Sequence, residues 1–168
     1  MKNSNVNPVI RLASLTLETF ERGNAYGSSD ARVSNHIGLE QLGASYTEVP
    51  PGKSSCPFHV HHVDEEMFVI LEGKGRYRFG STVYEVEAGD VLGAPCGRAE
   101  FAHKLTNTGT QTLKYLAIST LARTDVCEYP DSGKFAVGTR SNEPEEFGYI
   151  GRDDDPLDYW EGEPDSAY

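Results

Sequence analysis

The sequence predicts an all-β domain, a sandwich or barrel of short antiparallel strands, and three observations indicate this class. Short apolar segments alternate with glycines, which is typical of strands joined by tight reversals. The sequence has no long helical periodicity and no internal repeat. Its 168 residues suffice for one domain with a buried core, so we expect a single domain over residues 1–168.

The strongest strand signals lie in the middle of the chain. They combine apolar, β-branched and aromatic residues, and the glycines between them allow the positive φ angles of tight turns. These segments are 67–71, 76–79, 82–86 and 113–118. Residues 45–121 are therefore predicted to form one continuous β body.

The two flanks are less regular, and we expect irregular N- and C-terminal extensions at residues 1–44 and 123–168. Residues 10–20 fit either an edge strand or a short helix, and residues 24–35 are polar enough for a loop. The C-terminal flank keeps large apolar side chains such as Trp160. We expect this flank to pack on the barrel or on a neighbouring subunit.

Composition excludes several classes of function. The net charge of −11 repels phosphate backbones, so we expect no nucleic-acid partner. No apolar stretch approaches the ~20 residues that cross a bilayer, so no membrane span is expected. The N-terminus lacks the apolar stretch of a secretory signal, which predicts a cytoplasmic location.

The three cysteines, Cys56, Cys96 and Cys127, fit neither a disulfide framework nor a zinc ribbon, because no C-x-x-C spacing is present. Cys56 and Cys96 flank the candidate site in sequence and could act as thiolate ligands or redox groups. Isolated cysteines are more often small apolar residues, so we expect reduced thiols.

Residues 58–66 concentrate three imidazoles and three carboxylates. Side chains alternate along a strand, so His59 and His61 are predicted to share one face, with Val60 and His62 on the other. Two imidazoles would then converge on the same point.

Two further side chains are predicted to face the same interior. Glu66 shares its strand face with Phe68, and His103 shares one with Phe101 and Leu105. A carboxylate buried among imidazoles is costly unless a partner compensates it, and a divalent cation does so.

We therefore predict that His59, His61, Glu66 and His103 hold one divalent transition metal per chain. Three nitrogen ligands and one oxygen ligand suit Mn, Fe, Ni, Co or Zn, and an octahedral ion would keep positions open for a small-molecule ligand. The side chains expected to line the substrate pocket are Phe68, Glu100, Phe101 and Leu105.

The other candidates are assigned outside the metal shell. His62 is expected at the surface or behind the ligands, and His36 at the surface. Glu65 stays open as an alternative to Glu66, because a turn between strands can shift the alternation by one residue.

The residues of this centre resemble the cupin superfamily, whose two motifs are both visible. The first motif matches Gly52, His59, His61, Glu66 and Gly73, and the second matches Gly89, Pro95, Gly97, His103 and Asn107. The resemblance covers about residues 45–121 and implies a double-stranded β-helix, the jelly-roll barrel. Two spacings depart from the pattern: Gly52 lies one residue too early, and three extra residues separate Gly97 from His103, so that Glu100 takes the place of the third histidine in a strict alignment.

The resemblance implies several functions, and the sequence leaves open whether the protein is an enzyme. Bacterial single-domain cupins are labelled sugar-phosphate isomerase-like, which implies an isomerase or epimerase with a basic clamp for phosphate. Arg76 and Arg78 could form that clamp, although Tyr77 and Phe79 compete for the inward side. The alternatives are a metal-dependent dioxygenase, or binding of a small carboxylate or sugar without turnover. Small cupins also commonly pair, so a homodimer is expected.

Overall fold

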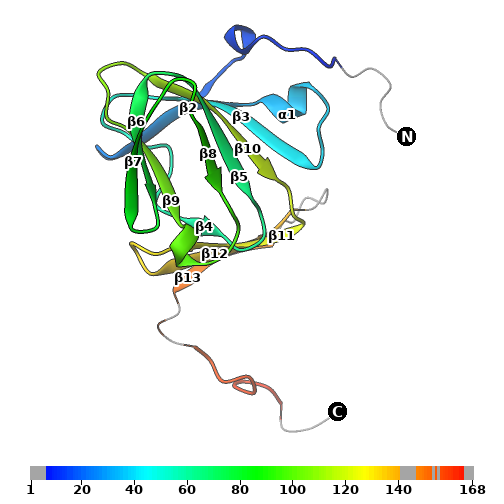
Figure 1. Cartoon of the computed structure of the whole chain (residues 1–168). Coiled ribbons are helices and arrows are strands. Elements are labelled where there is room, and N and C mark those ends of the chain that lie inside the picture. The colour runs from blue at the N-terminus through cyan, green and yellow to red at the C-terminus, as the bar shows by residue number, and fades with distance from the viewer. Residues whose placement is uncertain (1–6, 141–146, 153, 155, 165–168) are drawn as a thin grey trace.

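The computed structural model describes residues 7–140, 147–152, 154 and 156–164. It is built mainly of antiparallel strands, which confirms the all-β class (Figure 1). Within the described residues no helix is long and apolar enough to span a bilayer. The elements in chain order are η1 (Leu12–Ser14), β1 (Glu18–Arg22), β2 (Tyr26–Arg32), α1 (Val33–His36), β3 (Leu42–Val49), β4 (Val60–His61), β5 (Glu66–Glu72), β6 (Lys74–Phe79), β7 (Thr82–Glu87), β8 (Val91–Ala94), η2 (Ala99–Phe101), β9 (His103–Asn107), β10 (Leu113–Thr120), β11 (Thr124–Tyr129), β12 (Lys134–Thr139) and β13 (Gly148–Arg152).

Three sheets form the body of the protein. The largest has the order β1-β2-β3-β10-β5-β8, the second β7-β6-β9, and the third β13-β12-β11-β4. The main core lies between the first two sheets, where Phe68 and Ile70 of β5 are buried with Tyr77 of β6 and Leu105 of β9. Alternation along β5 explains this packing, because Met67 between the inward positions is exposed.

The four strands predicted most strongly are confirmed as β5, β6, β7 and β10. On β6 the aromatic residues take the inward side, since Tyr77 is only 4% exposed while Arg76 is exposed. The extra residues before His103 form part of the short 3-10 helix η2.

The loop predicted over residues 24–35 is wrong, because β2 and α1 occupy most of it. β2 pairs with β3 in the large sheet, with Ala31 opposite Tyr46. Its sequence hides this, since the residues that it buries include the polar Ser28. The inner side of β2 lines a polar cavity, so no apolar alternation marks the strand.

The C-terminal flank forms β11, β12 and β13, and β11 pairs with β4 beside the histidine cluster. That part of the flank packs on the barrel, as expected. Beyond β13 the chain runs away from the body (Figure 1), and Tyr159 and Trp160 are 82% and 72% exposed. Contact of these rings with a neighbouring subunit stays a prediction.

Candidate metal centre

Two distant segments meet where His59 bridges to His103. The His59 N–H donates to the His103 carbonyl at 3.1 Å, and the His103 N–H donates back to the His59 carbonyl at 2.7 Å. On the other side β4 pairs with β11, which sets Cys127 opposite His61. Val60 is fully buried between the two histidines, so the imidazoles on either side of it face the opposite way.

The side chain of Glu66 lies at the centre of three imidazoles. Its Oε2 atom is 3.0 Å from Nε2 of His103 and 3.6 Å from Nε2 of both His59 and His61. All four side chains are between 3% and 20% exposed. The structure therefore brings together the four side chains that the sequence pattern indicated, while their role as metal ligands stays a prediction.

Two overlapping groups of ligand atoms occur here. The donor atoms of His59, Glu66 and His103 lie within 4.8 Å of one another, and so do those of His59, His61 and Cys127. The second group includes a thiol that the sequence analysis did not associate with the site. A harder ion such as Mn²⁺ favours the group containing the carboxylate.

The far nitrogen of each ring has its own acceptor. Nδ1 of His59 lies 2.9 Å from the Pro57 carbonyl, Nδ1 of His103 lies 3.4 Å from the Phe101 carbonyl, and Nδ1 of His61 contacts the Asp125 carboxylate. When Nδ1 carries the proton, each Nε2 presents a lone pair to the space around Glu66. Outer partners of this kind orient metal-ligating histidines and fix their tautomer.

Burial and hydrogen bonding compete to set the charges of the centre. Burial raises the pKa of Glu66, but hydrogen bonds from His103 and His59 outweigh it and hold that pKa well below its usual range. Burial lowers the pKa of His103, and Glu66 offsets this only in part. At His59, hydrogen bonds to Cys56 and Glu66 outweigh burial and raise the pKa. A bound cation would replace the proton on His59, so binding would release protons.

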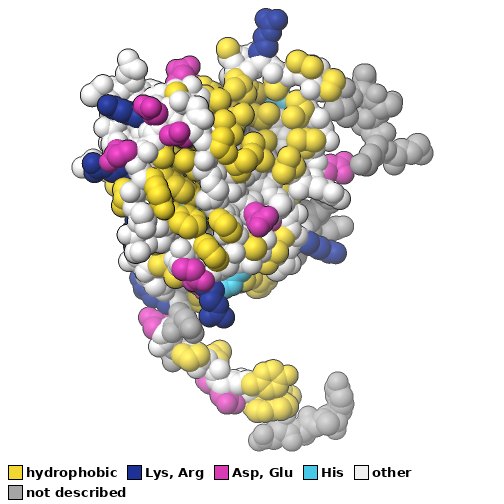
Figure 2. Space-filling model, in the orientation of Figure 1, with side chains coloured by type: hydrophobic (Ala, Val, Ile, Leu, Met, Phe, Trp, Pro, Cys, Tyr) yellow, Lys and Arg dark blue, Asp and Glu magenta, His cyan; other side chains and the backbone are white. Residues whose placement is uncertain are grey.

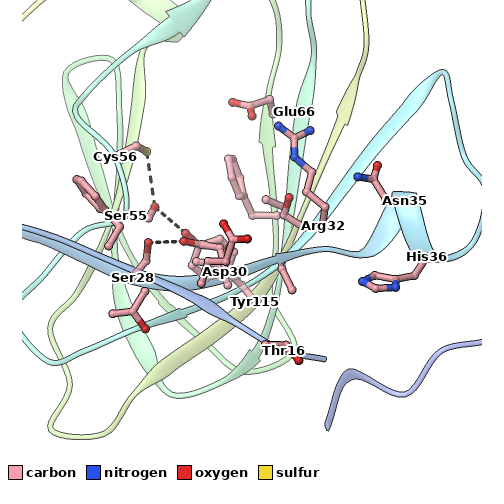
Figure 3. Close-up of a pocket in the computed structure, with 18 of the residues that line it drawn as sticks. Thr16, Ser28, Asp30, Arg32, Asn35, His36, Ser55, Cys56, Glu66 and Tyr115 are labelled. Atoms are coloured by element: carbon pink, nitrogen blue, oxygen red, sulfur yellow. Dashed lines mark hydrogen bonds between the residues drawn. The ribbon is translucent and has the colours of Figure 1, made fainter. Parts of the chain in front are cut away.

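A cavity of about 830 Å³ opens onto this centre, a volume typical of small-molecule sites. His59 and Glu66 line the part of the cavity at the metal centre, and Arg32 and Asp30 line the wall that β2 forms (Figure 3). Its wall is rich in hydroxyl groups. These come from Thr16, Thr19, Ser28, Ser45, Thr47, Ser55 and Tyr115.

Comparison with known proteins identifies the barrel. Residues 45–119 match the family model of the cupin domain, from within β3 to within β10. The chain carries a cupin domain. Glu66 and the three histidines around it lie inside the matched residues.

Relatives support the same fold. A candidate sugar phosphate isomerase from Acidithiobacillus ferrooxidans is 28% identical with a TM-score of 0.68, covering 82% of this chain and 86% of that protein. A sugar phosphate isomerase of the cupin superfamily from Silicibacter pomeroyi has a TM-score of 0.76 at 21% identity, with 90% of this chain and 98% of that one covered. An oxalate-binding protein of Thermotoga maritima is 34% identical over 71 residues, which are 42% of this chain and 55% of the relative. The chain spans about half the length of the curated relatives it matches.

The residues predicted to line a substrate pocket in this cupin domain have different positions. Phe68 lines the cavity beside Glu66. Glu100 is exposed on η2, Phe101 packs against the ring of Phe79, and Leu105 is buried in the main core. Those three lie outside the lining of the cavity.

The basic clamp considered on β6 also lies elsewhere. Arg76 pairs with Glu85 on the neighbouring strand, and Arg78 pairs with Asp131 while its guanidinium covers the Phe58 ring. Neither arginine lines the cavity. The arginine that does so is Arg32, on the strand that the sequence analysis took for a loop.

The remaining histidines and the neighbouring glutamate lie outside the cluster around Glu66. His62 faces away from the centre and its Nε2 contacts Glu128 Oε1 at 2.8 Å. Glu65 is exposed, so the carboxylate that faces the imidazoles is that of Glu66. His36 is exposed, as predicted, and also lines the mouth of the cavity.

Sequence reasoning missed Asp64, which anchors the segment between the histidines and Glu66. Asp64 is 1% exposed and accepts hydrogen bonds from the Thr120 hydroxyl at 2.9 Å, the Ala122 N–H at 2.7 Å and Arg140 at 2.6 Å. Thr120 ends β10, Ala122 follows that strand and Arg140 follows β12, so no local pattern reveals these partners. Asp125 was missed for the same reason, since it contacts His61 and accepts from the Val63 N–H at 3.0 Å.

Asp64→Asn is expected to destabilise the protein by about 1–3 kcal/mol, because a buried carboxylate loses charge-assisted hydrogen bonds. Burial raises the pKa of Asp64, but the hydrogen bonds outweigh it and lower that pKa below its usual value. The stabilisation is therefore complete above the unfolded pKa of roughly 3.9 and is lost as the pH falls through the lower folded value.

Urea denaturation of both proteins between pH 7 and pH 3 measures this difference. Asp131→Asn is the control, because Asp131 forms an exposed pair with Arg78 that we expect to contribute less than about 1 kcal/mol. Equal losses of unfolding free energy in the two variants would contradict the assigned role. So would a gap between Asp64→Asn and the wild type that grows as the pH falls.

Proposed function

We propose that this cupin-domain protein is a metal-dependent isomerase or epimerase of a small sugar-like molecule. The observation that supports this most is the cavity, whose hydroxyl-rich wall leads to Glu66 and His59. Hydroxyl side chains donate and accept hydrogen bonds, as the hydroxyls of a sugar do. An oxygenase for an apolar substrate would favour an aromatic-lined cavity, whereas most of the residues that line this one have polar side chains.

The proposal begins with one divalent transition metal on His59, His61, Glu66 and His103. Buried imidazoles around one carboxylate oxygen, each with an outer acceptor, support this ligand set. When bound, such an ion would polarise a carbonyl oxygen of the substrate. The identity of the ion stays open among Mn, Fe, Ni, Co and Zn.

His61→Ala should lower the affinity for Mn²⁺ or Zn²⁺ by at least about tenfold, because a ligand is removed. Asp125→Asn should lower it by about 10- to 100-fold through the orientation of His61. His62→Ala is the matched control and should keep the affinity of the wild type, since His62 faces Glu128.

Elemental analysis and competition with a chelator on protein made without an affinity tag provide the readout. Equal loss of metal affinity in the His61 and His62 variants would show that the two side chains do not differ in the way strand alternation predicts. Folded wild-type protein that takes up no transition metal would contradict the proposal.

Isomerisation moves a proton between neighbouring carbons and needs no external oxidant or reductant, so a proton carrier inside the cavity suffices. We assign this role to Asp30 on β2. Its Oδ2 accepts a hydrogen bond of 2.6 Å from the buried Ser28 hydroxyl, which fixes the carboxylate within the cavity. A carboxylate held in this way can take a proton from one carbon and return it to the next.

Metal-loaded protein in deuterated water should therefore introduce deuterium next to the carbonyl of an aldose, a ketose or one of their phosphates, as followed by NMR. Asp30→Asn should slow this exchange at least about a hundredfold while keeping its metal. Asp131→Asn, far from the cavity lining, should exchange at the wild-type rate. Wild-type protein that exchanges none of these compounds would exclude the isomerase.

Binding without turnover is the second candidate, favoured by the similarity to the oxalate-binding protein of Thermotoga maritima. Metal-loaded protein that binds oxalate tightly but exchanges no sugar would select this candidate. The volume of about 830 Å³ favours a ligand larger than oxalate.

We also propose a homodimer formed through the outer face of β8, β5, β10 and β3. Figure 2 shows apolar side chains gathered there, and Met67, Val91 and Leu42 are 39%, 62% and 41% exposed. A strand that is apolar on both faces, as β5 is, normally has both faces covered.

Light scattering during size-exclusion chromatography should therefore give twice the chain mass of 18.5 kDa. Val91→Glu should shift the protein to the monomer, while Val83→Glu on the exposed side of β7 should not. A wild-type mass of one chain would contradict the proposed interface.

A further inference from the structure

Arg32, the last residue of β2, is the one Lys or Arg side chain among the described residues that line the cavity. Figure 3 shows its guanidinium directed toward the side of the cavity where Glu66 lies. Asn35 and His36 of α1 lie at the same edge of the cavity. A guanidinium, an amide and an imidazole thus line this edge of the cavity, with the guanidinium on the side of Glu66.

The Arg32 backbone pairs with Ser45 of β3, but its side chain makes no hydrogen bond or ion pair with any described residue. Some basic side chains outside the cavity have acidic partners, for example Lys53 with Glu21 and Lys114 with Glu72. Arg32 forms no ion pair with Glu66, whose Oε2 faces the three imidazoles. The cavity therefore contains a charge that the described protein leaves without a partner.

We propose that Arg32 binds an oxyanion of the substrate, a phosphate or a carboxylate, at the end of a sugar-like chain whose carbonyl lies at the metal centre. This inference rests on the proposed function and names its substrate class. The guanidinium presents paired N–H donors that match the two oxygens of such a group. A divalent ion on the histidines would add positive charge to the same cavity, so an anionic ligand between the two would be favoured from both ends.

Asp30 and Glu18 on the same wall help to define the substrate. Their carboxylates repel a second anion near them, while Asp30 and the neighbouring hydroxyls can hydrogen-bond to uncharged sugar hydroxyls. The pattern therefore fits a molecule with one anionic end rather than a dianion of two equivalent ends such as oxalate.

The test measures binding of D-glucose 6-phosphate, D-glucuronate and D-glucose to metal-loaded protein by calorimetry. We expect the two anions to bind at least about tenfold more tightly than D-glucose, and Arg32→Gln to remove that advantage while leaving D-glucose unchanged. Arg32→Lys should restore part of it, because the charge returns without the paired donors. The stronger of the two anions identifies phosphate or carboxylate as the group recognised.

Arg22→Gln is the matched control, because Arg22 is exposed at the end of β1 and lies outside the cavity lining. It should bind all three compounds as the wild type does. Wild-type affinities in Arg32→Gln, or wild-type protein with no preference for the anions, would overturn the proposal. Loss of metal in Arg32→Gln would also overturn it, since Arg32 would then act on the centre itself.

The isomerase proposal and the anion-site proposal can be contradicted independently of each other. Anion binding that depends on Arg32 in a protein without deuterium exchange would retain the anion site and exclude the isomerase. Exchange that continues in Arg32→Gln with an unchanged KM for the phosphate would retain the isomerase and exclude the anion site.

Discussion

The pair of backbone hydrogen bonds between His59 and His103 is the contact on which the candidate centre depends. It joins the segment before β4 to the start of β9, so imidazoles from two distant parts of the chain face the same carboxylate. Burial of Val60 then fixes which face of β4 is directed toward Glu66. Asp64 holds the following turn to the end of β10 and to Arg140, and Asp125 holds it to β11. The geometry around Glu66 is therefore determined by long-range contacts as much as by local sequence.

The barrel and its extensions contribute different parts of the cavity. The cupin barrel supplies the imidazoles, Glu66 and the apolar floor at Phe68. The N-terminal strands β1 and β2 supply polar and charged groups, among them Asp30 and Arg32. On this account the barrel provides the metal chemistry, whereas the extension selects the substrate. A strongly acidic chain that turns a guanidinium without a partner into its cavity is consistent with an anionic ligand.

The sequence predicted the features that depend on alternation and missed those that depend on distant partners. Strands β5, β6, β7 and β10 carry apolar alternation. Alternation also predicted that His59, His61 and Glu66 face the same interior. β2 escaped notice because its inner side lines the cavity instead of packing in the core, so polar residues occupy positions where a core strand would be apolar. Asp64 looked like any acidic residue in a charged cluster, since Arg140 and Ala122 become its neighbours only after folding.

Anomalous diffraction at the metal absorption edge, from crystals of protein loaded with Mn²⁺ or Zn²⁺, tests whether these four side chains hold one ion. We expect one peak at roughly 2.0–2.2 Å from Nε2 of each of the three histidines and from an oxygen of Glu66. A peak bound by His59, His61 and the Cys127 thiolate with Glu66 unattached, or no peak in this interior, would contradict this expectation.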